Sequence, residues 1–340
     1  MSCRLQTRPG RVGSGGRPGA VRATACHPAR RLVRRAGRNP QSGAALLLAM
    51  VILTFVTTIA AGMVWQQWRG IQVEEAERAR AQSAWILNGA LDWARLILRE
   101  DARSGGADHL GEPWAVPLAE ARISTFLASD KNNAEDAPEA FLSGSIADEQ
   151  SRYNLNHLMN DGKLVPAQLA MLQRLCESAG LSSDVAQRLA EGLLAATRGD
   201  PDATLLPQTV AQLVWLGLDA ATVERLAPWV TLLPGSAPVN LNTAPREVIA
   251  AVIDGLDLAS AERLVQSRQR QPFKTVDDAR AVLSTTAKLD FSGVGVASSY
   301  FEIRGRLRLE QRVLEERSLV QRRQLEVVPL RRERINLFAG

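Results

Sequence analysis

The sequence predicts an α+β protein with one very long N-terminal helix, a middle region of short helices and C-terminal antiparallel strands. Three observations carry this prediction. Residues 44–68 are uncharged, and residues 69–103 continue with a helical period and no proline. Residues 160–285 repeat a pattern of short helices joined by Gly or Pro. Residues 300–310, YFEIRGRLRLE, alternate between apolar and charged side chains, as a half-buried strand does.

The positive net charge of the chain comes from its N-terminus. Residues 1–43 contain ten Arg, no Lys and no acidic residue, and the first acidic residue is Glu74. The remaining 297 residues hold 31 basic and 36 acidic side chains. The basic character therefore belongs to a leader and does not indicate a nucleic-acid surface.

The uncharged segment 44–68 is long enough to cross a bilayer as a helix, which takes about 20 apolar residues. Arginines such as Arg34, Arg35 and Arg38 precede it, so the positive-inside rule predicts a cytoplasmic N-terminus. The rest of the chain is then expected in the periplasm or outside the cell.

Three interpretations of this N-terminus compete. It is an uncleaved signal anchor, a secretory signal peptide cut near Ala60-Ala61-Gly62, or a leader cut after Gly43, at QSG|AALLL. The residues that follow favour the third. If residues 44–104, which we call the stem helix, form one helix of about 60 residues, it is about 90 Å long. A cleaved signal peptide does not predict such continuity.

The second half of the stem helix has one face of small and apolar residues. They recur at intervals of three and four, while Asn88, Asp92, Arg95 and Arg99 follow the opposite face. The residues of the small and apolar face are Ala76, Ala79, Ser83, Leu87, Ala90, Ala94 and Leu98.

The residues around the apolar segment resemble the type IV pilins and type II secretion pseudopilins. In that family a prepilin peptidase cuts after a glycine and N-methylates the new first residue, here Gly43 and Ala44. Most members have Glu as the fifth residue after the cut, whereas this sequence has Leu48. Since an unpaired carboxylate in lipid is costly, a subunit with nothing ahead of it gains nothing from that Glu. Its absence is typical of the minor pseudopilin K family, whose members lie at the filament tip.

The middle of the chain contains an internal repeat. GLDAATVERL (217–226) and GLDLASAERL (255–264) match at seven of ten positions, and GLSSDVAQRL (180–189) is a weaker copy. Thr243 is expected to cap a helix. Tyr153-Asn154-Leu155-Asn156 is echoed by Val239-Asn240-Leu241-Asn242, whose asparagines are expected to close turns. The repeats resemble helix-hairpin-helix motifs, and the pseudopilin K family carries a large helical domain inserted in the pilin-like fold.

Helix-hairpin-helix motifs often bind DNA, so a membrane-anchored DNA-uptake protein is the alternative function. However, the hairpin turns carry Asp219 and Asp257 where a phosphate-binding turn needs a second glycine. Residues 151–290 contain 13 basic and 15 acidic side chains, without the cationic excess of a nucleic-acid binder. Nucleic acid is therefore not expected as a partner.

The resemblance implies a pilin-like stem helix packed on a small antiparallel sheet, with an inserted all-α domain. A strand is expected within 141–153, a short helix near LAEARISTFLA (118–128), and three strands after residue 299, with Pro329 on an edge. The predicted boundaries are 1–43 for a cleaved basic leader, 44–66 for the membrane part of the stem, 67–104 for its periplasmic half, 105–153 for a loop and strand region, 154–292 for the helical domain and 293–340 for the C-terminal strands.

No motif of an enzyme is present, because the sequence lacks G-x-S-x-G, P-loop, H-E-x-x-H and C-x-x-C patterns. We expect no catalytic residue and no cofactor. Some members of the resembled family bind calcium, and Asp130 and Asp136 in DKNNAED are weak calcium candidates. A solvated turn is the preferred interpretation there and at Asp148 and Glu149. Cys176 is expected to be a small buried residue.

The resemblance implies a minor pseudopilin at the tip of the type II secretion pseudopilus. It would initiate or cap the filament and help to export folded proteins across the outer membrane. The expected partners are the I-type and J-type minor pseudopilins, packed on the small and apolar face of the stem helix, the major pseudopilin filament, the prepilin peptidase, the secretin and exported proteins. The expected location is the inner membrane, spanned once, with the main domain in the periplasm.

Overall fold

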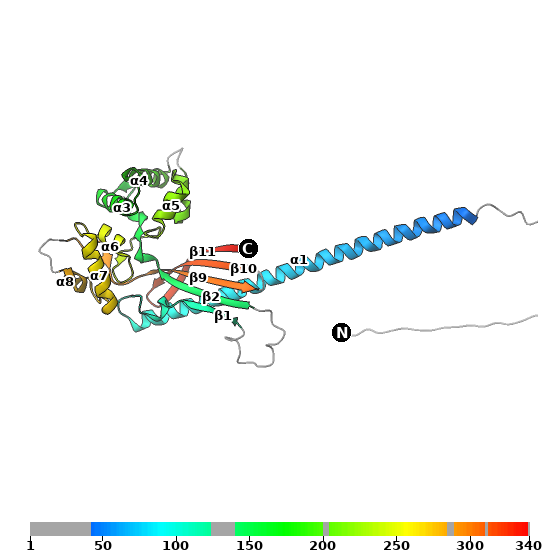
Figure 1. Ribbon diagram of the computed structural model, residues 1–340, viewed down its shortest axis with the longest axis horizontal. Helices are drawn as coiled ribbons and strands as arrows, with labels where there is room; N and C mark the ends of the chain where they lie inside the picture. Colours follow the sequence, from blue (N-terminus) through cyan, green and yellow to red (C-terminus); the bar gives the residue numbers. More distant parts are fainter. Residues whose placement is uncertain (1–41, 124–139, 200–203, 284–288, 310–311, 339–340) are drawn as a thin grey trace, which may run out of the picture. The chain divides into compact units, whose positions relative to one another are not determined.

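A computed structural model of the chain describes residues 42–123, 140–199, 204–283, 289–309 and 312–338 (Figure 1). It divides into two units, one up to Gly70 and one from Ile71 onward, and each is described by itself.

Helix α1, Ser42–Ser104, is the predicted stem helix. It is continuous because its sequence contains no proline and no helix-breaking pair before Gly105 and Gly106, both of which have positive φ. In the first unit its apolar side chains are all exposed. This is the one helix among the described residues that is long and apolar enough to cross a membrane.

The second unit contains a five-stranded antiparallel sheet in the order β1-β2-β9-β10-β11. The strands are β1 (Leu118–Arg122), β2 (Ala140–Asp148), β9 (Tyr300–Leu309), β10 (Arg312–Arg323) and β11 (Glu326–Phe338). The alternation in β9 has the predicted sense, with Phe301, Ile303 and Leu307 buried. Pro329 lies in the edge strand β11, where the missing N–H does not interrupt an interior ladder.

The stem helix packs on one face of this sheet. Leu91, Ala94 and Leu98 of α1 join Phe301 and other strand residues in one buried cluster. The cluster also contains Trp114 from the short 3-10 helix η1 (Pro113–Ala115). The indole N–H of Trp114 donates to the Glu112 carboxylate. The stem is therefore held by its own sheet along its last turns, as the apolar period predicts.

The helical region lies between β2 and β9 in the sequence and has its own, larger core. Its helices are α3 (Pro166–Ser178), α4 (Ser183–Arg198), α5 (Ala220–Leu226), α6 (Arg246–Val252), α7 (Leu258–Arg270) and α8 (Val276–Leu283). Short elements join them: η2 (Glu149–Ser151), η3 (Leu155–Leu158), η4 (Val210–Leu216), β3 (Tyr153–Asn154), β4 (Met159–Asn160), β5 (Lys163–Leu164), β6 (Val230–Thr231), β7 (Val239–Asn240) and β8 (Val294–Gly295).

The region is built as two similar halves. The first half begins with β3, which pairs in parallel with β6. The second half begins with β7, which pairs in parallel with β8. Asn154 and Asn240 occupy the same place in the two halves, and each accepts the backbone N–H two residues ahead. The asparagine echo therefore marks a repeated structural unit, and the expected turn closure is confirmed.

Residues 118–122 form strand β1 and pair with β2 along the sheet edge, so the short helix expected near 118–128 does not include them. Ile123 is helical, and the part from residue 124 lies outside the described residues. One local prediction is wrong. Thr243 does not cap α6, because the N-cap residue of that helix is Pro245. The Thr243 hydroxyl donates to the Asp148 carboxylate instead.

Candidate functional site

The predicted processing site lies at the very start of α1. Gly43 and Ala44 are in its first turn, and both are exposed. A Cβ added at Gly43 would meet no atom within 4 Å. Leu48 lies one turn further, with its side chain also exposed. The chain itself therefore places no structural demand on Gly43, so any requirement for glycine there comes from outside the described fold.

The predicted partner-packing face of the stem helix requires a correction. Four of its seven residues, Ser83, Leu87, Ala94 and Leu98, are buried in the chain itself. They face the sheet, so they are not a surface open to partners. Ala76, Ala79 and Ala90 are half-buried. The periodic small and apolar residues of this face therefore indicate packing of the stem helix on the chain's own sheet.

A different stripe of the stem helix is open. Trp85 is 77% exposed, Trp93 is 50% exposed, and Leu96 is also exposed. With Gly89 between the two tryptophans, these residues recur at intervals of three and four and share one side of α1. We call them the tryptophan stripe. Exposed large apolar side chains gathered on one surface indicate an interaction site.

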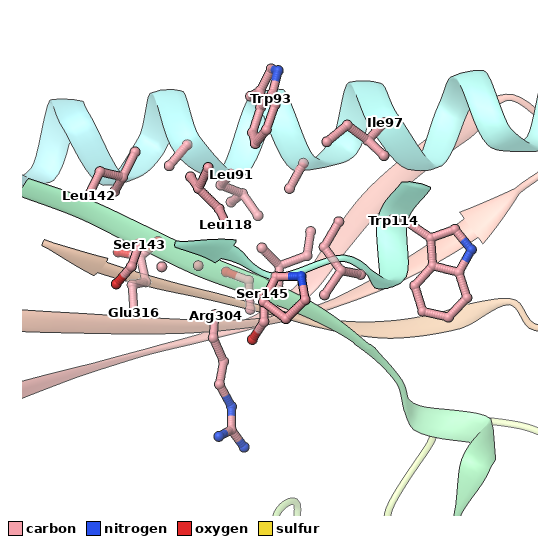
Figure 2. A pocket seen from close by; sticks show the side chains of 18 of the residues that line it. Leu91, Trp93, Ile97, Trp114, Leu118, Leu142, Ser143, Ser145, Arg304 and Glu316 are labelled. Carbon is pink, nitrogen blue, oxygen red and sulfur yellow. The ribbon is translucent and has the colours of Figure 1, made fainter. Parts of the chain in front are cut away.

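Beside the tryptophan stripe is an apolar cavity of about 450 Å³ between α1 and the sheet (Figure 2). Leu91, Trp93 and Ile97 come from α1, and the strands line the other side. Figure 2 shows Leu142 near one end of the cavity and Trp114 near the other. A cavity of this size is in the range of ligand and side-chain pockets.

A buried polar junction joins the sheet to the helical region. Asp148, at the end of β2, accepts hydrogen bonds from the hydroxyls of Ser298 and Thr243, each at 2.6 Å. It also accepts from the side chain of Asn240 at 3.1 Å and from the backbone N–H of Gln150 at 2.8 Å. The expectation that Asp148 and Glu149 are solvated is therefore wrong, because both are buried.

The junction continues to the end of the stem helix. Arg322 of β10 pairs with Asp101 at 2.6 Å and also with Asp108, whose carboxylate accepts the backbone N–H of Ser298. Asp101, Asp108 and Glu112 have carboxylate oxygens within 4.8 Å of one another, the one such group among the described residues. The Arg322 guanidinium already supplies a positive charge to two of them. The calcium candidates Asp130 and Asp136 lie outside the described residues.

The junction should make stability depend on pH. Burial raises the pKa of Asp148 to about 6 despite four hydrogen bonds that favour its charged form. A raised pKa means that its contribution to stability is complete below pH 4 and is lost as the pH rises through 6. Relative to Asp148→Asn, which cannot ionise, the wild type is expected to lose about 2 kcal/mol of unfolding free energy between pH 4 and pH 7.

Urea unfolding of residues 71–340 at several pH values, for both proteins, measures this difference. Asp101, Asp108 and Glu149 also have pKa values raised mainly by burial. Comparison with Asp148→Asn removes their contribution, since both proteins share them. A difference that does not change with pH would show that Asp148 keeps an ordinary pKa.

The hairpin turns do not form phosphate sites. The Asp219 carboxylate accepts the backbone N–H of Thr222, and the Asp257 carboxylate accepts that of Ser260. Each acid therefore caps its own helix, occupies the N–H that a phosphate would need, and repels anions. This geometry speaks against the DNA-binding alternative.

Sequence reasoning missed the tryptophan stripe and most of the junction. A signal for the stripe exists, because Trp85 and Trp93 follow a helical period outside the small and apolar face. For the junction, the sequence marked Asn240 through its echo of Asn154, whereas Thr243 and Asp148 were given other roles. Asp108, Asp148 and Arg322 carry no local pattern.

Comparisons with known proteins agree with this architecture. Two family models, both for type II secretion system (T2SS) protein K, match this chain, one at residues 151–235 and the other at residues 239–304. A type II secretion system protein K from Pseudomonas aeruginosa is 30% identical over 324 residues, which cover 87% of this chain and 90% of that protein. One from Pectobacterium carotovorum is 26% identical, covering 83% and 93%.

A solved structure shares the fold. It is the crystal structure of the GspK-GspI-GspJ complex from the enterotoxigenic Escherichia coli type 2 secretion system. The match has a TM-score of 0.58 at 18% sequence identity and covers 77% of this chain and 98% of the matched chain. Because a protein K relative is 30% identical and is matched over 90% of its length, this chain belongs to the type II secretion system protein K family of minor pseudopilins.

Proposed function

We propose that the chain is the tip subunit of the type II secretion pseudopilus, where it initiates or caps the filament during export of folded proteins across the outer membrane. The observation that carries this proposal is Leu48. No acidic residue occurs between Gly43 and Glu74, so the membrane part of α1 has no carboxylate to pair with the terminal amine of a subunit ahead of it. An unpaired carboxylate in lipid is costly, and a tip subunit has no partner for one.

The proposed subunit is a single-pass protein of the inner membrane, with the arginine-rich side cytoplasmic and the unit from Ile71 onward periplasmic. Prepilin peptidase cuts between Gly43 and Ala44 and the new N-terminus is methylated. The I-type and J-type minor pseudopilins pack on the tryptophan stripe, and the major pseudopilin filament follows behind them. The secretin and exported proteins meet the helical region. No cofactor is required for this role.

The position in the filament can be tested by gold labelling of the helical region on pseudopili sheared from cells. The wild type is expected at one end only. Leu48→Glu restores the carboxylate and is expected to place the label along the filament body, whereas Leu48→Ile keeps it at the end. Wild-type label along the body would rule out the tip assignment.

A further inference from the structure

The apolar cavity between α1 and the sheet contains one buried carboxylate. Glu316 of β10 lines this cavity on its sheet side, and its side chain is 6% exposed (Figure 2). Arg304 also contributes to the lining, but its guanidinium pairs with Glu302, and Figure 2 shows its side chain pointing away from the cavity. The other described residues of the lining are uncharged. The cavity is therefore an apolar space that carries a single negative charge.

The ion pair of Glu316 uses only one of its two carboxylate oxygens. Arg334 of β11 donates to Oε2 from Nε at 3.3 Å and from Nη2 at 2.9 Å, and these are the hydrogen bonds that Glu316 accepts within the described parts of the chain. The Arg334 side chain is 47% exposed, so the cation of the pair lies toward solvent while the carboxylate is buried. A buried charge is costly unless it is fully hydrogen-bonded. Oε1 is therefore open to a further donor.

Two glycines keep the space beside Glu316 open toward the cavity. Gly144 of β2 is paired with Gly305 of β9, which is in turn paired with Glu316, so the three residues face the same side of the sheet. A Cβ on Gly305 would lie 3.3 Å from Leu87 of α1, and one on Gly144 would lie 2.8 Å from the carbonyl oxygen of Arg304. No side chain therefore stands between the carboxylate and the part of the cavity that β2 lines.

We propose that this cavity binds a small organic ammonium ion. The apolar body of the ligand lies between α1 and the sheet, and its N–H groups donate to Oε1 of Glu316. A neutral apolar molecule would leave that oxygen unpaired, and an anion would be repelled. The volume of about 450 Å³ suits a small molecule. Because α1 packs directly on the sheet through Leu91 and Ala94, a second helix, about 10 Å across, does not fit between them.

Three ligands of nearly equal shape test the charge preference. They are 2-phenylethylamine, which is cationic at pH 7, the neutral 2-phenylethanol and the anionic 3-phenylpropanoate. The full-length chain is held in phosphatidylcholine nanodiscs, and calorimetric titration is corrected with empty nanodiscs. The amine is expected to bind roughly tenfold tighter than the alcohol, and the anion is expected not to bind. The Tm of the chain should rise with the concentration of the amine. Equal affinities for amine and alcohol would overturn the proposal without any variant.

A matched pair of variants locates the charge that the ligand meets. Glu316→Gln keeps the shape of the side chain and removes its charge, so the amine is expected to lose its advantage over the alcohol. Glu315→Gln is the control, because Glu315 is the preceding residue of β10, pairs with Arg317 and does not line the cavity. It is expected to bind the amine like the wild type. Equal amine affinities in the two variants would place the ligand elsewhere and overturn the proposal.

Replacing the present partner of Glu316 gives a change in the opposite direction. Arg334→Gln removes the competing cation and leaves the buried carboxylate without a counter-charge. The amine is therefore expected to bind several-fold tighter than in the wild type, and to raise the Tm of this variant more than that of the wild type, because it replaces the missing charge. A smaller rise in Tm than in the wild type would show that the ammonium group does not pair with Glu316.

Discussion

Replacing Asp148 by alanine is expected to lower the unfolding free energy of residues 71–340 by about 3–5 kcal/mol at pH 7. The side chain is the common acceptor for Ser298, Thr243, Asn240 and the backbone N–H of Gln150. Alanine leaves these buried donors without that acceptor and opens a small cavity. The donors come from both sides of the boundary between sheet and helical region, so the loss affects the attachment of one to the other.

Chemical unfolding followed by circular dichroism measures this loss. The matched control is Asp254→Ala, which removes the same group from an exposed ion pair with Arg174 and is expected to change stability by less than about 1 kcal/mol. Protease digestion of Asp148→Ala should also release the helical region sooner. A change as small as that of the control would mean that the donors find other acceptors and that the junction does not hold the two parts together.

The parts of the fold that the sequence predicted are those with a long regular pattern. The stem helix follows from 63 residues without proline, and β9 follows from strict alternation over ten residues. Strand β1 is only five residues long and mostly exposed, so its pattern does not separate strand from helix. It becomes a strand because β2 offers an edge, which is a tertiary effect.

The candidate site was predictable only where a function leaves a local pattern. Gly43 and Leu48 stand at fixed places around an apolar run. The face of the stem helix was recognised, yet its meaning was wrong, since periodicity shows that Leu87 and Leu98 are covered without showing by what. Asp148 and Arg322 lie 174 residues apart in the sequence, and only the folded chain brings Ser298 into contact with both of them.

Replacing Gly43 by leucine is expected to abolish processing of the N-terminus and to reduce secretion by the type II system at least tenfold. The structure separates this effect from folding. Gly43 is helical and exposed, and an added Cβ would touch nothing within 4 Å. Leucine is also a better helix former than glycine. A loss of function would therefore support the proposed cleavage site, at which the peptidase recognises the residue before the cut.

Gly62→Leu is the matched control, because Gly62 is also a glycine of α1 with open space around it. It should be processed like the wild type. The mass and N-terminal sequence of the three proteins recovered from membranes decide the outcome. A wild-type chain that starts at N-methylated Ala44, with Gly43→Leu longer, supports the leader. A wild type that starts near Ala61 would mean a secretory signal peptide, and an uncut one a plain anchor. In both cases the apolar part of α1 would not be the stem of a pseudopilin, and the tip assignment would lose its basis at Leu48.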